Sequence, residues 1–233
     1  MTTLELERRQ IREPVALRGN EGSGRIGGYA LKFNKLSRNL GGWVEQIAPE
    51  ALNKSAGDGW PGVMARYNHD LLLGTIQGES LRLSIDGTGL DYEVDLLEDP
   101  ASQRVRALVA RQDVARSSFA AYMHESDWTL TPDGFPLRTV LGMSLVDVAP
   151  VDDPAYYDTS TGLRSLAEAR SMDVTEVEQL ARENKLADLI TPAAVVFDMG
   201  QRPHSPGQAG QGETHPSGQV SVLLRALELK KQL

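Results

Sequence analysis

The sequence predicts a mixed α and β fold, and three patterns carry this prediction. Alternating apolar residues predict strands at 26–34, 43–47, 63–69, 113–122 and 138–149. Two further alternating stretches flank the turn Asp86-Gly-Thr-Gly89, which predicts a β-hairpin over 81–96. Asp99-Pro100 is a helix start, and the apolar residues after it recur at helical spacing (Ala101, Val105, Leu108 and Val109).

The chain before the first strand is polar and then rich in glycine, so residues 1–24 are expected to be a flexible lead. In the strand at 26–34, Tyr29, Leu31 and Phe33 share one face. The segment 49–53 has proline near its start and predicts a single helical turn. Residues 124–129 and 131–135 are polar and carry turn residues, which predicts an exposed excursion with a solvated His124.

The composition is that of a soluble globular protein long enough for one substantial core. The chain has 233 residues, of which 40% are hydrophobic and 24% charged, and a net charge of −8. This acidic balance argues against nucleic acid or an anionic membrane as a partner. The chain has no cysteine, which excludes disulfides, thiolate nucleophiles and cysteine-ligated zinc. Residues 1–14 lack the apolar region of a secretory signal, so a cytosolic location is expected.

Ser118 is the candidate nucleophile, because small residues surround it on the strand at 113–122 and leave room for a substrate. A serine hydroxyl needs a base and a group that orients the base, and His69 and Asp147 are candidates for these two roles. Strand alternation places the neighbouring Ser117 on the opposite face. His69 shares a face with apolar residues, so a core or turn histidine that bonds a backbone carbonyl is the alternative interpretation.

Asp147 stands where the strand pattern requires an apolar residue, in phase with Leu141, Met143 and Leu145. A buried carboxylate is unfavourable by several kcal/mol unless it is paired or hydrogen-bonded. An imidazole N–H would compensate this cost. The alternative is an aspartate at a strand end that reaches water.

Several blocks resemble the tailed-phage prohead maturation proteases, capsid-processing serine peptidases related in fold to herpesvirus assemblin. The blocks follow the family's order over about residues 25–160 and are Arg25-Ile-Gly-Gly-Tyr-Ala-Leu-Lys-Phe-Asn34, Gly42-Trp-Val-Glu-Gln-Ile-Ala-Pro-Glu-Ala-Leu52, Asn68-His69-Asp70, Ser118-Phe119 and Leu145-Val-Asp-Val-Ala-Pro-Val-Asp-Asp-Pro-Ala-Tyr156. By position, the resemblance makes Ser118 the nucleophile, His69 the general base and Asp147 the acid that orients it. The chain departs from the family in having Arg116-Ser117 and Ala120-Ala121 around the serine, where glycines are common, and an aspartate at 147, where glutamate is frequent.

The resemblance implies a β-barrel surrounded by helices, over a protease domain at residues 25–162. It also implies cleavage of the scaffold segment of the major capsid protein, of scaffolding protein and of the protease itself. The enzyme would act as an oligomer inside assembling proheads in the host cytoplasm. Two other functions remain open: an inactive protease-like assembly factor and, less well supported, a hydrolase of small esters. The residues do not identify the oxyanion donors, and Arg138 near the site is equally well interpreted as a surface ion-pair partner.

The rest of the chain predicts a helical extension at 163–199, a flexible linker at 200–218 and a terminal docking helix at 219–233. A charged, weakly amphipathic helix over 165–189 forms most of the extension. His204 and His215 lie in the linker and are interpreted as linker residues rather than metal ligands. No cofactor or metal is expected.

Overall fold

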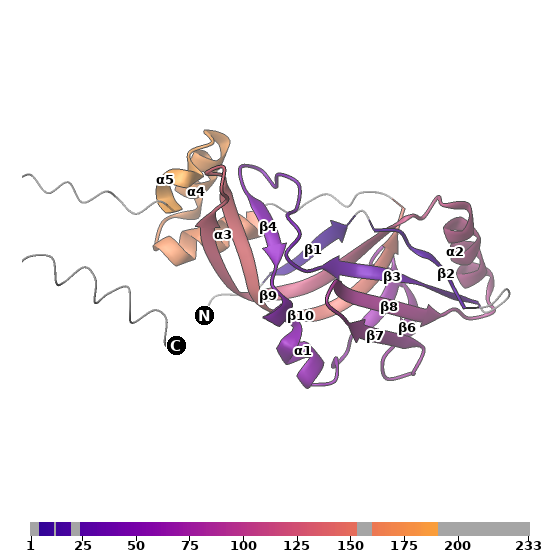
Figure 1. Cartoon of the computed structure of the whole chain (residues 1–233). Coiled ribbons are helices and arrows are strands. Elements are labelled where there is room, and N and C mark those ends of the chain that lie inside the picture. Colours follow the sequence, from indigo (N-terminus) through magenta and orange to yellow (C-terminus); the bar gives the residue numbers. More distant parts are fainter. Residues whose placement is uncertain (1–4, 12, 20–23, 153–159, 191–233) are drawn as a thin grey trace, which may run out of the picture. The chain divides into compact units, whose positions relative to one another are not determined.

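The computed structural model describes residues 5–11, 13–19, 24–152 and 160–190, which belong to one compact unit (Figure 1). The predicted linker at 200–218 and the predicted docking helix at 219–233 lie outside the described residues. The same holds for Pro154, Ala155 and Tyr156, the end of the last block that carries the family resemblance.

The described strands pair into two sheets. The larger sheet has the order β1 (Leu6–Ile11), β9 (Arg116–Leu130), β10 (Pro136–Val151), β5 (Met64–Tyr67) and β6 (Leu71–Thr75), and β4 (Val44–Ile47) also pairs with β10. The smaller sheet has the order β2 (Ala16–Arg18), β3 (Arg25–Lys32), β8 (Gly89–Asp95) and β7 (Leu81–Ile85). The hairpin predicted at 81–96 is therefore confirmed.

The mixed α and β class is confirmed, but the implied closed barrel is not found among the described residues. β1 and β6 end the order of the larger sheet, and β2 and β7 end that of the smaller one, so both sheets are open. The sheets are held together by side chains. One hydrophobic core contains Ile26, Leu90 and Tyr92 from the smaller sheet together with Phe119 and Val148 from the larger one.

The expectation of a flexible lead at 1–24 is wrong, because β1 and β2 both lie within it. β1 buries Glu7 and Arg9 on the side of the sheet where apolar residues would be expected. A hydrophobicity pattern cannot detect a strand whose buried positions are charged, since the compensating partners come from distant parts of the sequence.

Two β-bulges explain why predicted faces differ from observed ones. In β3 the register shifts between Tyr29 and Leu31, so Tyr29 turns outward and donates its hydroxyl to Asp86 at 2.6 Å. In β10 the register shifts between Val140 and Gly142, which buries Val140 and leaves Leu141 half-buried. A bulge inserts an extra residue and reverses the alternation beyond it, so a strict period of two fails at these points.

The predicted excursion at 124–129 is instead the far half of β9. β9 and β10 form a long antiparallel hairpin that closes at residues 131–135 (Figure 1). His124 is exposed, as expected. The hydrophilic character of this part of β9 arises because both of its faces are largely exposed, and Trp128 is its buried exception.

The predicted helix after Asp99 is confirmed as α2 (Pro100–Arg111), whose first backbone N–H groups donate to the Asp99 carboxylate. The predicted turn at 49–53 is a short 3₁₀ helix, η1 (Pro49–Leu52), that continues into α1 (Asn53–Gly57).

The single helix predicted over 165–189 is instead divided into α3 (Ser160–Arg170), α4 (Val174–Arg182) and α5 (Leu186–Ile190). Ser171 and Asn184 lie between these helices with φ of 53° and 56°, a left-handed conformation that ends a right-handed helix. The expected boundary after residue 162 falls inside α3.

α3, α4 and α5 enclose a second hydrophobic core with two tryptophans. Trp43 and Trp128 lie 5.2 Å apart between ring centroids, in a tilted arrangement. Around them pack apolar side chains of the three helices: Leu163, Leu166, Ala167, Val177, Ala181 and Leu186. These helices therefore cover Trp43, which directly precedes β4, and Trp128 of β9.

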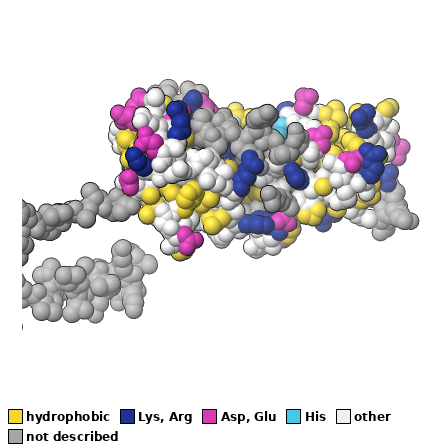
Figure 2. Space-filling view, turned by 90° about the horizontal axis from the view of Figure 1, so that it is seen from above, with side chains coloured by type: hydrophobic (Ala, Val, Ile, Leu, Met, Phe, Trp, Pro, Cys, Tyr) yellow, Lys and Arg dark blue, Asp and Glu magenta, His cyan; other side chains and the backbone are white. Residues whose placement is uncertain are grey.

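The surface carries charged side chains of both signs, as the composition of the chain indicates. On the face shown in Figure 2, acidic and basic side chains are interspersed, without a broad field of one sign. Within the described ranges no helix is long and apolar enough to cross a membrane.

The contact between α3 and Trp43 gives a test of this packing. A Cβ built on Gly162 would lie 2.1 Å from the Trp43 ring, whereas a Cβ on Gly57 in α1 would meet nothing within 4 Å. We expect Gly162→Ala to lower the free energy of unfolding by about 1–3 kcal/mol through overpacking. Gly57→Ala is the control and should be neutral or slightly stabilising. Urea unfolding of both variants measures this, and equal stability of the two would contradict the packing of α3 on Trp43.

Candidate active site

Ser118 lies in the buried first half of β9, between β1 on one side and β10 on the other. It pairs with Gln10 of β1 and Ala149 of β10. Its side chain and that of Ser117 meet different partners. The Ser117 hydroxyl lies 3.5 Å from the Tyr92 hydroxyl in the core, whereas the Ser118 hydroxyl lies 2.7 Å from His69 Nε2. The predicted alternation of the two serines is therefore observed.

His69 lies in the tight turn between β5 and β6 rather than on a strand. Asn68 and His69 both have left-handed backbone conformations, with φ of 54° and 61°. Such conformations are unfavourable for residues other than glycine and persist where surrounding contacts fix them. Here the Asn68 backbone N–H donates to the Pro150 carbonyl oxygen at 3.0 Å. The Asn68 side chain donates through Nδ2 to the Asp152 carboxylate and accepts through Oδ1 from the Asp152 backbone N–H.

Asp147 lies on β10, beside Met64 of β5 in a parallel pair. This pairing brings the β5–β6 turn, and with it His69, to the carboxylate. A register shift between Leu145 and Asp147 forms a β-bulge at this point, and bulges redirect the side chains next to them. The Asp147 side chain is buried, and its Oδ1 lies 2.7 Å from His69 Nδ1.

The three side chains thus form one hydrogen-bonded chain from Asp147 through His69 to Ser118. An ionised carboxylate only accepts hydrogen bonds, so His69 Nδ1–H donates to Asp147. In the neutral imidazole Nε2 then carries a lone pair, directed at the Ser118 hydroxyl at 2.7 Å. This arrangement can take a proton from the serine and return it to a leaving group.

Ser118 Oγ has a second neighbour, the backbone carbonyl oxygen of Arg9 on β1, at 3.0 Å. A hydroxyl has one proton, so it donates either to His69 Nε2 or to this carbonyl. Ser118 is also completely buried, with 0% of its surface exposed, while His69 retains 9%. An external peptide therefore cannot reach Ser118 Oγ in the conformation described here.

Arg138 is not a surface ion-pair partner, which corrects that interpretation of the sequence. It is buried in a cluster with Glu7, Arg9 and Glu45, next to the strand pair that carries Ser118. Burial alone would lower the pKa of Arg9, but the charges of Glu45 and Glu7 outweigh burial and raise it. For the carboxyl of Glu45, burial acts in the opposite direction and would raise its pKa, but the charges of Arg9 and Arg138 outweigh burial and lower it. Arg9 and Glu45 therefore stabilise each other's charged forms within the cluster.

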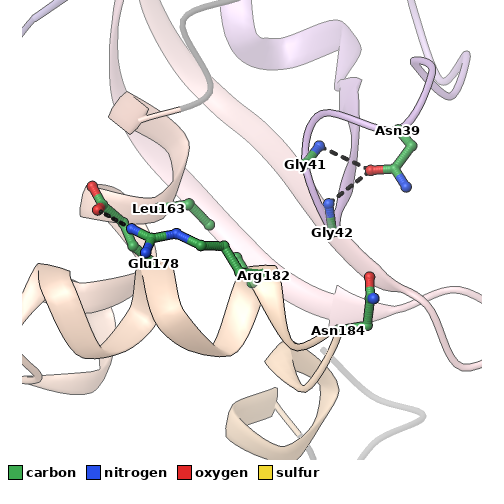
Figure 3. A pocket seen from close by; sticks show the side chains of 8 residues that line it. Asn39, Gly41, Gly42, Leu163, Glu178, Arg182 and Asn184 are labelled. Atoms are coloured by element: carbon green, nitrogen blue, oxygen red, sulfur yellow. Dashed lines mark hydrogen bonds and ion pairs between the residues drawn. The ribbon is translucent and has the colours of Figure 1, made fainter.

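Another hollow among the described residues is lined by none of the side chains of Ser118, His69 and Asp147. A cavity of about 500 Å³ opens between the α3–α4 helices and residues 39–42, as Figure 3 shows. Among its polar groups, Asn39 Oδ1 accepts from the backbone N–H of Gly41 and Gly42, and Arg182 pairs with Glu178. No residue of the Ser118–His69–Asp147 chain lines this cavity.

No group of three or more His, Asp or Glu side chains suited to a metal ion occurs in the parts of the chain that the structure describes. His204 and His215 lie outside those parts.

Comparison with protein-family models gives a match to the Caudovirus prohead serine protease family over residues 10–177. This chain belongs to that family. The match covers most of the chain and includes Ser118, His69 and Asp147 as well as α3. Membership implies a serine peptidase of phage prohead maturation. Neither a curated protein nor a solved structure matches the chain.

Sequence analysis missed three features of this region. The bracing of His69 by Asn68 and Asp152 depends on contacts between residues 84 positions apart. The contact of Ser118 with β1 and the buried charge cluster also depend on strand pairing. The sequence of β1 shows three consecutive charged residues, Glu7, Arg8 and Arg9, which does not distinguish the buried positions from the exposed one.

The left-handed turn gives a test of how His69 is positioned. Asn68→Gly keeps a backbone that tolerates positive φ but removes the side-chain bonds to Asp152. We expect kcat on a peptide substrate to fall by about tenfold with KM little changed, because small displacements of a catalytic group are costly. Asn184→Gly, at the other left-handed asparagine described above, is the matched control and should keep kcat. Equal kcat in the two variants would show that Asn68 does not position His69.

Proposed function

We propose that the chain is the serine endopeptidase that cleaves capsid-assembly proteins during phage prohead maturation. Ser118 is the nucleophile, His69 the general base and Asp147 the residue that orients His69. The observation that carries this proposal is the pair of 2.7 Å contacts that join Ser118, His69 and Asp147 in a chain matching the prohead protease family. These contacts join residues 49 and 78 positions apart and bury a polar chain beside the core, which costs free energy that apolar side chains would not.

The mechanism follows from these roles. Ser118 Oγ attacks the carbonyl carbon of the substrate while its proton moves to His69 Nε2. The resulting imidazolium is stabilised by Asp147 and gives the proton to the leaving amine, which breaks the peptide bond and leaves an acyl-enzyme. Water then attacks the ester with His69 again as base, releasing the carboxylic acid and restoring Ser118. We assign no oxyanion donor: Arg138 is committed to the buried charge cluster.

The substrates that family membership favours are the scaffold segment of the major capsid protein, scaffolding protein and the protease itself. Cleavage inside the assembling prohead, in the host cytoplasm, would bring enzyme and substrates to high local concentration. An oligomeric enzyme is part of this proposal.

One observation favours a second candidate, an inactive protease-like assembly factor. Ser118 is fully buried, which an enzyme must relieve before it can act on another chain. The cleavage assay described next separates the two candidate functions.

We expect Ser118→Ala to reduce cleavage of a capsid-protein substrate by at least about a thousandfold, because the nucleophile is lost. Ser117→Ala should keep most of the activity, since that hydroxyl faces Tyr92. The measurement is the rate of product formation on gels or by mass spectrometry. A fully active Ser118→Ala variant would remove Ser118 from its role, and absence of cleavage by the unaltered chain under all conditions would favour the assembly factor.

Asp147→Asn tests the orienting residue. The amide can donate to Nδ1 and so favour the imidazole tautomer that cannot accept the Ser118 proton. We expect a folded variant whose kcat is lower by on the order of a hundredfold or more. Retention of full activity, with unfolding unchanged, would place the third member elsewhere, and Asp70 and Asp113 would be the next to test.

A further inference from the structure

Strand β1 covers the nucleophile. It pairs with β9 over Leu6–Ile11, and its Arg9 carbonyl oxygen accepts a hydrogen bond from Ser118 Oγ at 3.0 Å. Ser118 has no exposed surface in this arrangement. The Arg9 carbonyl oxygen competes with His69 Nε2 for the single proton of the Ser118 hydroxyl. This contact therefore belongs to a state of the enzyme in which Ser118 is not reacting.

Building on the proposed function, we propose that β1 occupies the edge of β9 on which an extended substrate segment binds, and that the described conformation is a latent one. A substrate must displace β1 before Ser118 can attack it. β1 ends the strand order of its sheet, so β9 is its only strand neighbour and keeps its pairing with β10 when β1 leaves. The N–H and C=O groups of β9 that it uncovers are then available to an incoming strand, which would bind by β-strand addition.

The buried charge cluster explains how β1 is held and why it can still leave. β1 supplies one positive and one negative member, Arg9 and Glu7, which pair with each other. The remaining members, Glu45 of β4 and Arg138 of β10, lie 3.1 Å apart. Removal of β1 therefore divides the cluster into two neutral pairs and leaves no buried charge without an opposite partner, which is the costly outcome for buried ions.

A cavity beside β1 supports the same assignment. It has a volume of about 380 Å³, and it is lined by Arg9, Gln10 and Ile11 of β1 together with apolar residues that include Leu31, Ile47 and Phe119. Displacement of β1 would open this partly apolar space along β9, where substrate side chains on the Phe119 side of the strand can be received.

A disulfide that locks β1 to β9 tests the proposal in the full chain. Leu6 and Tyr122 are partners in the β1–β9 register, and partners in antiparallel strands have Cα spacings that a disulfide accepts. The chain has no cysteine, so Leu6→Cys/Tyr122→Cys creates a single possible disulfide. Arg82→Cys/Glu93→Cys joins partners of β7 and β8 in the other sheet and is the matched control.

The readouts are cleavage of a peptide substrate and the rate at which a fluorophosphonate probe labels Ser118. We expect the oxidised β1–β9 lock to lower both by at least about tenfold, since access requires a local opening that the lock forbids, and reduction to restore both. The oxidised control should match the unaltered chain. An oxidised lock as active as its reduced form would overturn the proposal.

Failure of the proposed function would give a different result. The unaltered chain, the control and both forms of the lock would then all be unreactive, and Ser118→Ala would change nothing. Activity in the reduced lock also shows that the two substitutions leave the protein folded, so loss on oxidation cannot arise from misfolding.

Discussion

The structure depends on pairing the charged side chains that it buries with hydrogen-bond or ion-pair partners. Asp147 is a carboxylate within the larger sheet, and an unpaired buried carboxylate would be unfavourable by several kcal/mol. The compensating N–H comes from His69, which the left-handed turn after β5 brings to 2.7 Å. Because the Asp147 contact fixes one ring nitrogen, the other is directed at Ser118. The hydrogen bond that compensates the buried carboxylate therefore also sets the ring orientation that the proposed role of His69 as a base requires.

The cluster of Glu7, Arg9, Glu45 and Arg138 follows the same logic at the neighbouring strand pair. Each member has two partners of opposite sign, and removal of one member would leave the buried cluster with an unbalanced charge. Buried ion pairs contribute little net stability compared with apolar packing, but they fix register. In this protein the register matters chemically, because it sets the Arg9 carbonyl against Ser118. Structural and functional constraints on β1 are therefore coupled.

Local sequence patterns predicted the features that depend only on residues close together in the chain. The hairpin β7–β8, the capped helix α2 and the opposite orientations of Ser117 and Ser118 follow from turn residues, capping and alternation. Three motif residues proposed for one site also lie together. The bulges in β3 and β10, the charged strand β1 and the open sheets depend on pairings between distant residues. The hydrophobic periodicity of a sequence contains no information on such pairings. The resemblance implied a barrel, and hydrogen bonds between the described strands do not close one.

The central claim is that Ser118, His69 and Asp147 act as one catalytic unit. Groups that act as a unit lose their effect together, so their losses do not multiply. The most direct measurement is kcat/KM for Ser118→Ala, for His69→Ala and for the double variant on the same capsid-protein substrate. We expect the double variant to be no slower than Ser118→Ala alone. Losses that multiply in the double variant would show that the two residues contribute independently and do not form one catalytic unit.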